Sequence, residues 1–268
     1  SHFAELATTQ GAKVVALVRP TSNTAFLSSL GVTLSTGNLL DDASLAAGMR
    51  GCDAVVHAAS PVGGWGAPAL YRQNTIDGTR NVIAAMQATG VKTLVYISTI
   101  SVHGIDPTEG KPVSEADGFG GRFLSYDHYG RAKVEAEKLV AAAHAAGAIQ
   151  ATTLRPGWMY GPRDKNSFGR LASMMRHGLG IKVGRGENQI ALVYAGNVAR
   201  AMWTVLAKPS PDYRVYLCAS DGEVTQTRYF ESVVRAAGTR RGPISLPKDL
   251  LLALGTAQEW LSIAVGYR

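Results

Sequence analysis

Tyr129 and Lys133 stand four residues apart in the segment Tyr129-Gly-Arg-Ala-Lys133. On a helix this spacing puts both side chains on one face. A phenol has a reference pKa of about 10, and a nearby ammonium group favours its ionised form, so Lys133 is expected to bring the pKa of Tyr129 toward neutrality. The pair could then transfer a proton, and Lys133 could also hold a ribose hydroxyl. The spacing is weak evidence by itself, because it also fits an ordinary tyrosine on a surface helix.

Two hydroxyl side chains follow the apolar segment Thr93-Leu-Val-Tyr-Ile97, namely Ser98 and Thr99. Ligands of parallel α/β sheets bind beyond the carboxyl ends of the strands. A hydroxyl there can bind a substrate oxygen and orient it toward Tyr129. The alternative is that Ser98 and Thr99 only hydrogen-bond to nearby backbone.

Short β-branched runs alternate with alanine-rich stretches of helical periodicity through the first part of the chain. The predicted strands are residues 13–18, 32–36, 53–58, 92–98 and 149–155. The predicted helices between them are residues 2–10, 23–30, 42–50, 67–89 and 129–146, with Asp42 as the N-cap of the third. Strands that are apolar on both faces and separated by such helices predict a buried parallel sheet built from βαβ units.

After Pro156 the alternation loosens into glycine-rich turns. A helix at 196–207, a strand at 213–218 and helices at 226–237 and 248–263 are predicted there. We expect a dinucleotide-binding domain at residues 1–160, to which 187–220 contributes the last elements. Residues 161–186 and 221–268 are expected to form a smaller substrate lobe. The predicted class is therefore α/β, with a doubly wound Rossmann-type sheet.

These motifs resemble an extended short-chain dehydrogenase/reductase, the superfamily of NAD-dependent epimerases and dehydratases. The resemblance runs from Ser1 to about Leu206 and includes Ser98-Thr-Ile-Ser-Val-His-Gly104 and Arg155-Pro-Gly-Trp-Met-Tyr-Gly-Pro162. It implies that Tyr129 and Lys133 are catalytic, that Thr99 is the active-site hydroxyl, and that Asn74 supports a proton relay. Asn74 could instead be an ordinary polar residue inside a helix.

The resemblance also implies a set of cofactor contacts. The segment that ends in Ala58, Ala59 and Ser60 resembles the strand end that lies along the dinucleotide. Asn38 and Leu39 resemble the family's Gly-Asp-Leu at the adenine, with Asn38 in place of the acid. The further cofactor residues that it implies are Ser98, Lys133, Pro156 and Trp158. The apolar surroundings of Trp158 also favour a place in the core.

The cofactor's identity is indicated by the end of the second βαβ strand, which reads Val18-Arg19-Pro20 and carries no acid. NAD sites place an acid there for the ribose hydroxyls, whereas an arginine suits the 2′-phosphate of NADP. We therefore expect NADP rather than NAD, with Arg19 as the residue that selects it. Arg19 could also simply face solvent.

The family's first strand and its glycine loop have no counterpart in the sequence. That strand is central in a doubly wound sheet, and the loop binds the pyrophosphate. We therefore expect either that residues precede Ser1 or that the fold is repaired locally. Otherwise the sheet has a gap at this place.

The expected function is hydride transfer between NADP and a carbonyl or secondary alcohol, with Tyr129 as the acid or base. The segments Ala59-Ser-Pro-Val62 and Gly64-Trp-Gly66 resemble 3β-hydroxysteroid dehydrogenases and dihydroflavonol reductases, which implies a bulky apolar substrate. Trp65 is expected to cap its pocket. The alternatives are a nucleotide-sugar epimerase or dehydratase on the same fold and a dinucleotide sensor without catalysis.

The remaining expectations come from composition. The net charge of +7 is scattered rather than striped, so no nucleic-acid partner is expected, and no apolar run is long enough for a membrane span. The histidines form no ligand spacing, so no metal is expected. Cys52 and Cys218 are expected to be free thiols in a cytoplasmic protein. Family analogy adds a homodimer through helices 67–89 and 129–146.

Overall fold

The computed structural model describes residues 1–62, 66–105, 112–164, 168–219, 222–251, 253–255 and 257. The chain divides into two compact units. Unit 1 comprises Ser1–Pro156 with Gly196–Cys218, and unit 2 comprises Gly157–Ala195 with Ala219–Arg268. The sequence predicts slightly different boundaries, with 157–160 and 187–195 in the dinucleotide-binding domain. These residues lie in unit 2 because their strands, β6 (Trp158–Tyr160) and β8 (Leu192–Tyr194), pair with each other.

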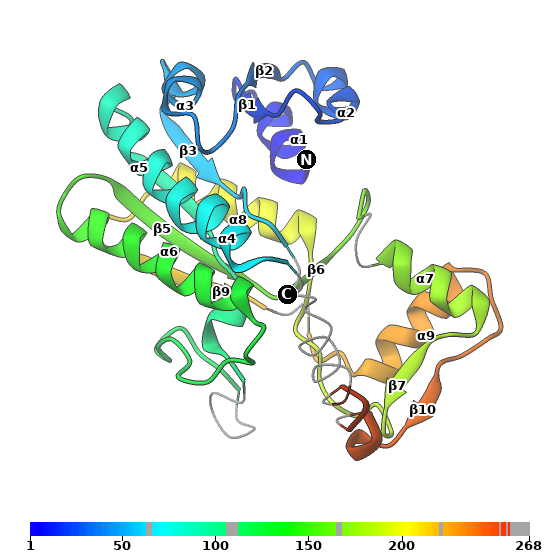
Figure 1. Cartoon of the computed structure of the whole chain (residues 1–268). Helices are drawn as coiled ribbons and strands as arrows, with labels where there is room; N and C mark the ends of the chain where they lie inside the picture. Colours follow the sequence, from blue (N-terminus) through cyan, green and yellow to red (C-terminus); the bar gives the residue numbers. More distant parts are fainter. Residues whose placement is uncertain are drawn as a thin grey trace. The chain divides into compact units, whose positions relative to one another are not determined.

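Unit 1 is built on a four-stranded parallel sheet in the order β3 (Ala54–His57), β4 (Thr93–Ile97), β5 (Gln150–Pro156) and β9 (Arg214–Cys218). The register pairs Val95 with Thr152 and Leu154 with Tyr216. Strand β4 is almost entirely buried, as its continuous apolar sequence predicts. Because all four strands run the same way, their carboxyl ends meet at one edge of the sheet (Figure 1).

Helices α5 (Gly78–Thr89) and α6 (His128–Ala145) cover one face of this sheet, and α8 (Ala195–Ala207) lies on the other (Figure 1). The main core forms where α5 and α6 meet β4, with Met86 and Val140 fully buried in it. Helix α3 (Asp42–Met49) packs on α5 and begins at Asp41, whose carboxylate accepts from the amides of Ala43 and Ser44. The prediction of Asp42 as the cap is therefore wrong by one residue.

A separate two-stranded parallel sheet is formed by β1 (Val15–Val18) and β2 (Thr33–Thr36), beside α1 (His2–Thr9) and α2 (Ala25–Ser29). Among the described strands, β1 pairs only with β2 and β3 pairs only with β4. Within the described residues, the sheet of β1 and β2 is therefore not hydrogen-bonded to the sheet that begins at β3, and no local repair joins them. Val15 and Leu17 on β1 are 39% and 37% exposed, so this sheet is not covered as the β4 region is.

The long helix predicted at 67–89 is interrupted. Helix α4 (Pro68–Tyr71) is followed by a π-helical turn, η1 (Arg72–Asp77), before α5 begins at Gly78. A π-turn inserts an extra residue per turn and is found frequently at functional sites. The Thr75 hydroxyl in η1 lies 2.8 Å from that of Ser60, which ties the turn to the segment after β3.

The described part of unit 2 contains two pairs of short parallel strands, helices α7 (Phe168–His177) and α9 (Gln226–Ala236), and helical residues at 248–251, 253–255 and 257, within the helix predicted at 248–263. Strand β6 pairs with β8, and β7 (Ile181–Val183) pairs with β10 (Ile244–Leu246). Helices α7 and α9 pack against each other over a second core that includes Met175 and Val233. The sequence predicts α9 but not α7, β7 or β10.

The structure also bears on the cysteines, on membrane-spanning helices and on metal sites. Cys52 and Cys218 are free and half-buried. In the described ranges, no helix combines the length and apolar character needed to cross a bilayer. Within the same ranges, no cluster of three or more histidine, cysteine or acidic side chains is arranged to hold a metal ion.

Burial of His57 makes the stability of unit 1 depend on pH. Its Nε2 lies 3.0 Å from the Thr79 hydroxyl, and burial, followed by the charge of Lys133, lowers the pKa of His57 to about 3. The unfolded chain binds a proton below pH about 6.5, whereas the folded chain does not do so until pH nears 3. The stability from this group is therefore complete above pH 6.5 and falls with the pH below it.

We predict that the free energy of unfolding loses about 2 kcal/mol between pH 7.5 and pH 5 through His57 alone. Urea titrations of the wild type and His57→Gln at both pH values measure this, because the variant should lose that part of the pH dependence. His177→Gln, a change at an exposed histidine, is the control and should keep it. Equal pH dependence in wild type and His57→Gln would show that His57 is not held neutral.

Candidate active site

The start of the predicted catalytic helix, α6, is fixed by an N-cap. Asp127 is its N-cap, and its Oδ1 accepts from the amide of Gly130 at 2.7 Å. A Cβ at position 130 would lie 2.6 Å from the Asp127 carboxylate, so this cap requires glycine there. Tyr129 is therefore held in the first turn of α6, and Lys133 follows one turn later on the same face.

Tyr129 and Thr99 are brought together as the sequence predicts. Thr99 follows β4, is 8% exposed, and its hydroxyl accepts from the amide of Ser101 at 3.2 Å. Its side chain also lies near enough to the Tyr129 hydroxyl to lower the pKa of that phenol. The ring of Tyr71 in α4 lies 6.5 Å from that of Tyr129, centroid to centroid, and forms an aromatic wall beside it.

The pKa of Tyr129 is not lowered in this structure. Burial raises the pKa, the nearby Thr99 side chain opposes that effect, and the charge of Asp127 adds to it. The expectation that Lys133 brings this pKa toward neutrality is therefore wrong for the unliganded site. The main reason is the burial of the Tyr129 phenol.

Lys133 is deeply buried, with 3% of its surface exposed. Its Nζ donates to the carbonyl oxygen of Ile97 at 2.8 Å and lies 5.0 Å from the centre of the Tyr96 ring. Burial lowers the pKa of Lys133 to about 8, and the carboxylate of Glu137 opposes that shift. An ammonium has three donors, so the bond to Ile97 leaves donors for a ligand at the strand edge.

Behind Lys133 lies a buried ion pair that sequence analysis did not predict. Glu137 is 1% exposed and Arg155 on β5 is 4% exposed. The Arg155 Nε lies 3.1 Å from Oε1 of Glu137, and Nη2 lies 2.5 Å from the same oxygen. The guanidinium also lies over the ring of Phe119, 5.3 Å from its centre. Such a planar, multiply bonded arrangement is the kind that makes a buried pair tolerable.

His103 extends this network on the other side of Arg155. Its Nδ1 lies 3.0 Å from the carbonyl oxygen of Gly118, so Nδ1 carries the hydrogen and donates. Its Nε2 is then the acceptor for Arg155 Nη1, 3.3 Å away. Burial first, and Arg155 second, lower the pKa of His103, which keeps the ring neutral in this tautomer.

A signal for this network was present in the sequence. Tyr129, Lys133 and Glu137 follow one another at intervals of four residues, which places all three on one helical face. The apolar stripe of α6, with Val134 and Val140, suggested instead that Glu137 lies beside the buried face. Arg155 appeared only within a motif, because no local pattern shows that a strand arginine will meet a helix glutamate.

Ser98 supplies a further polar group at this edge. Its amide donates to the carbonyl oxygen of Leu154 at 2.8 Å, whereas its hydroxyl is buried and has no hydrogen-bond partner among the described residues. An orphaned buried hydroxyl is costly and is therefore typical of a ligand contact. Asn74 lies in η1, half-buried, and its Nδ2 donates to the carbonyl oxygen of Leu70 at 3.0 Å.

The other predicted cofactor residues of unit 1 follow strands of the two sheets. Ala58 and Ala59 come directly after β3 and are exposed. Arg19 comes directly after β1 and is exposed, with its amide bonded to the Ser22 hydroxyl at 3.1 Å. Asn38, also exposed, already accepts from the Leu40 amide at 2.8 Å through Oδ1. The remaining predicted positions here are Leu39, whose carbonyl oxygen binds Asn81, Ser60 at η1, and Pro156 at the end of β5.

The two predicted tryptophans fall elsewhere. Trp158 lies on β6 in unit 2 and is 48% exposed, so the expectation of a core position is wrong. Its side chain instead lines a pocket of unit 2, with its ring 6.1 Å from that of Tyr229. Trp65 lies outside the described residues.

Sequence comparison identifies the family. The profile of the "NAD dependent epimerase/dehydratase family" matches residues 1–219. The chain belongs to the NAD-dependent epimerase/dehydratase family. This confirms the resemblance seen in the sequence, whereas the roles of Tyr129, Lys133 and Thr99 that the resemblance implies stay predictions.

Named members of the family are similar to most of this chain. A 2-alkyl-3-oxoalkanoate reductase from Shewanella oneidensis is 30% identical over 87% of this chain and 62% of its own length. A sterol-4-alpha-carboxylate 3-dehydrogenase from Candida albicans is 28% identical over 82% of this chain and 65% of its own length. The chain thus spans less than two thirds of either relative.

The fold of the epimerase/dehydratase family is also found by structural comparison. The structure of a UDP-glucose 4-epimerase from Thermus thermophilus in complex with NAD is similar, with a TM-score of 0.76. The match covers 92% of this chain and 82% of that one at 23% identity. The predicted α/β fold with a parallel Rossmann-type sheet is confirmed.

The buried network gives a prediction on stability. Glu137→Gln should leave Arg155 and Lys133 buried with no counter-charge, at a cost of about 3 kcal/mol in the free energy of unfolding. Glu135→Gln is the matched control on the same helix, because its exposed ion pair with Lys138 is worth little, about 0.5 kcal/mol. Urea unfolding of both variants measures the difference. Similar losses in the two variants would mean that the network does not stabilise the fold.

Proposed function

We propose that this protein is an NADP-dependent oxidoreductase that transfers hydride between the nicotinamide and a carbonyl or secondary alcohol of a bulky apolar substrate. The observation that carries the proposal is the meeting of the Tyr129 and Thr99 side chains at the carboxyl edge of the sheet, with the Lys133 ammonium buried one turn along α6. The names of two relatives, an oxoalkanoate reductase and a sterol 3-dehydrogenase, support reduction or oxidation at a carbonyl carbon.

The residues at this edge fit a dinucleotide. The orphaned Ser98 hydroxyl offers an unused hydrogen-bonding group, and the exposed Ala58 and Ala59 leave room for a flat ligand to approach the end of β3. Lys133 has donors left for a ribose. When bound, the nicotinamide would supply the hydride in reduction or accept it in oxidation.

The proton steps follow from the side chains. In reduction, the substrate's carbonyl oxygen would lie between the Thr99 and Tyr129 hydroxyls and form a hydrogen bond with each. Tyr129 is held protonated by its raised pKa, so its hydroxyl can donate a proton to that oxygen as the carbon is reduced. Asn74 would hold a water that returns a proton to the Tyr129 phenolate, and Lys133 would hold the ribose.

An epimerase or dehydratase acting on a nucleotide sugar is the alternative within the family. The fold is shared with a UDP-glucose 4-epimerase. Thr99 is followed by Ile100 and Ser101, which offer no second acid beside the tyrosine, and this favours simple carbonyl reduction.

The function is tested at Tyr129. Tyr129→Phe should lower kcat for reduction of a 2-alkyl-3-oxoalkanoate by about 10²- to 10⁴-fold, because the proton donor is lost. NADPH binding, followed by fluorescence, should stay unchanged. Tyr216→Phe, at a partly exposed tyrosine on β9, is the control and should keep full activity. Full activity in Tyr129→Phe would refute the assignment, and UDP-sugar epimerisation without NADPH oxidation would favour the alternative.

Cofactor choice is tested separately at Arg19. Arg19→Ala should weaken NADPH binding about tenfold, since one charge-assisted contact to a 2′-phosphate is worth about 1.5 kcal/mol. Binding of NADH should not change. Parallel titrations with both dinucleotides measure this, with Arg50→Ala as a control at another exposed arginine of unit 1. An equal loss of affinity for NADPH and NADH would show that Arg19 does not contact the 2′-phosphate.

A further inference from the structure

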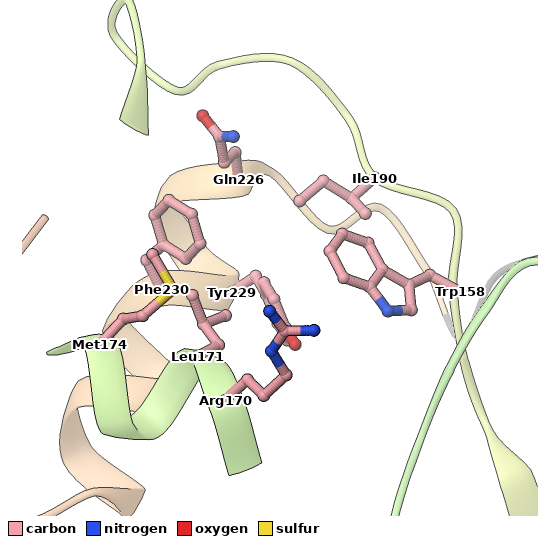
Figure 2. Close-up of a pocket in the computed structure, with 8 residues that line it drawn as sticks. All are labelled: Trp158, Arg170, Leu171, Met174, Ile190, Gln226, Tyr229 and Phe230. Atoms are coloured by element: carbon pink, nitrogen blue, oxygen red, sulfur yellow. The ribbon is translucent and has the colours of Figure 1, made fainter. Parts of the chain in front are cut away.

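Unit 2 contains a cavity of about 320 Å³ between its two helices and its first strand. Its walls come from α7, α9, β6 and the residue Ile190 before β8. Figure 2 shows the side chains of these four elements facing a shared space. The whole cavity is therefore formed within one unit.

Most of the wall is apolar. Trp158, Leu171, Met174 and Ile190 line it. Trp158 is 48% exposed and Met174 is 41% exposed, so large apolar surfaces stay open to solvent at this place. A concave apolar surface with a few polar groups is the usual form of a small-molecule site.

One polar group in the wall is a buried hydroxyl without a partner. Tyr229 on α9 is 7% exposed, and its Oη has no hydrogen-bond partner among the residues that the structure describes. Burial, and the charge of Asp164, raise the pKa of Tyr229, so the phenol stays protonated and can donate. Leaving such a donor unpaired costs about 1–3 kcal/mol, which a ligand's acceptor would recover.

The second polar group is cationic. Arg170, in the first turn of α7, lines the pocket, and no hydrogen bond or ion pair to its guanidinium is found within the described ranges. In Figure 2 its side chain extends toward Tyr229 and Trp158. Asp164, the acid that precedes α7 in the chain, already accepts from the amide of Phe168 at 2.9 Å. A phenol donor and a guanidinium in one wall suit a carboxylate.

We propose that this pocket binds an alkyl carboxylate, with the carboxylate on Arg170 and Tyr229 Oη and the chain along Trp158. The volume of about 320 Å³ is roughly ten times the 30 Å³ that one water molecule occupies in the liquid, so there is room for a medium-sized ligand. The ligand class is thus a medium-chain acid. The inference concerns binding within unit 2 alone and does not depend on the proposed function.

The test is direct binding of octanoate to the whole protein, followed by calorimetry and by Trp fluorescence. Octan-1-ol has the same chain without the charge and should bind at least tenfold more weakly. Arg170→Gln should weaken octanoate about tenfold and leave octan-1-ol unchanged, whereas Arg228→Gln, at an exposed arginine on α9, should change neither. Equal affinities for octanoate and octan-1-ol, or tighter binding of UDP at the same site, would overturn the proposal.

Tyr229→Phe separates a ligand role from a structural one. Removing an unpaired hydroxyl should leave the unfolding free energy unchanged or raise it, while the affinity for octanoate falls. Unchanged octanoate affinity in this variant and in Arg170→Gln would refute the site.

Discussion

One carboxylate serves two buried cations in unit 1, and the candidate site depends on it. Glu137 binds Arg155 directly and opposes the fall in the pKa of Lys133 that burial causes. Since Arg155 comes from β5 and both other residues from α6, the pair fixes the helix against the sheet at the edge where Thr99 ends its strand. Replacing such a pair by apolar residues can be harmless to stability, but removing one partner is not. Here the Glu137 carboxylate has a second effect, because it favours the ammonium form of Lys133 at a buried position.

The elements of unit 1 were largely predictable because their signals are local. Apolar runs of strand length and alanine-rich stretches between them predicted β1 to β5 and most helices to within a few residues. Gly31, Gly90 and Gly147 end helices with positive φ, as expected of C-terminal caps. The π-turn at 72–77 was not predictable, since nothing in the residue types there distinguishes it from α-helix. The elements of unit 2 were harder to predict from the sequence, because α7 lies between glycine-rich turns and because β7 and β10 are only three residues each.

Some contacts of the candidate site were likewise predictable from local sequence signals, and others were not. The nearness of Thr99 and Tyr129 was predicted because the Tyr129–Lys133 interval and the strand end before Ser98 are both visible in the sequence. The Lys133–Ile97 bond, the Arg155–Glu137 pair and the tautomer of His103 depend on which strand faces which helix turn. Only packing decides that. The same holds for Trp158, whose apolar neighbours in sequence suggested the interior although the residue lies half in solvent.

The cap of α6 has a consequence for how this site can vary. Asp127 and Gly130 act as one steric unit, because the carboxylate that starts the helix occupies the space in which a side chain at 130 would sit. A side chain beside the tyrosine would therefore displace the Asp127 carboxylate and weaken the cap, for a reason unrelated to catalysis. Variation at this one position is coupled to the start of the helix that carries Tyr129.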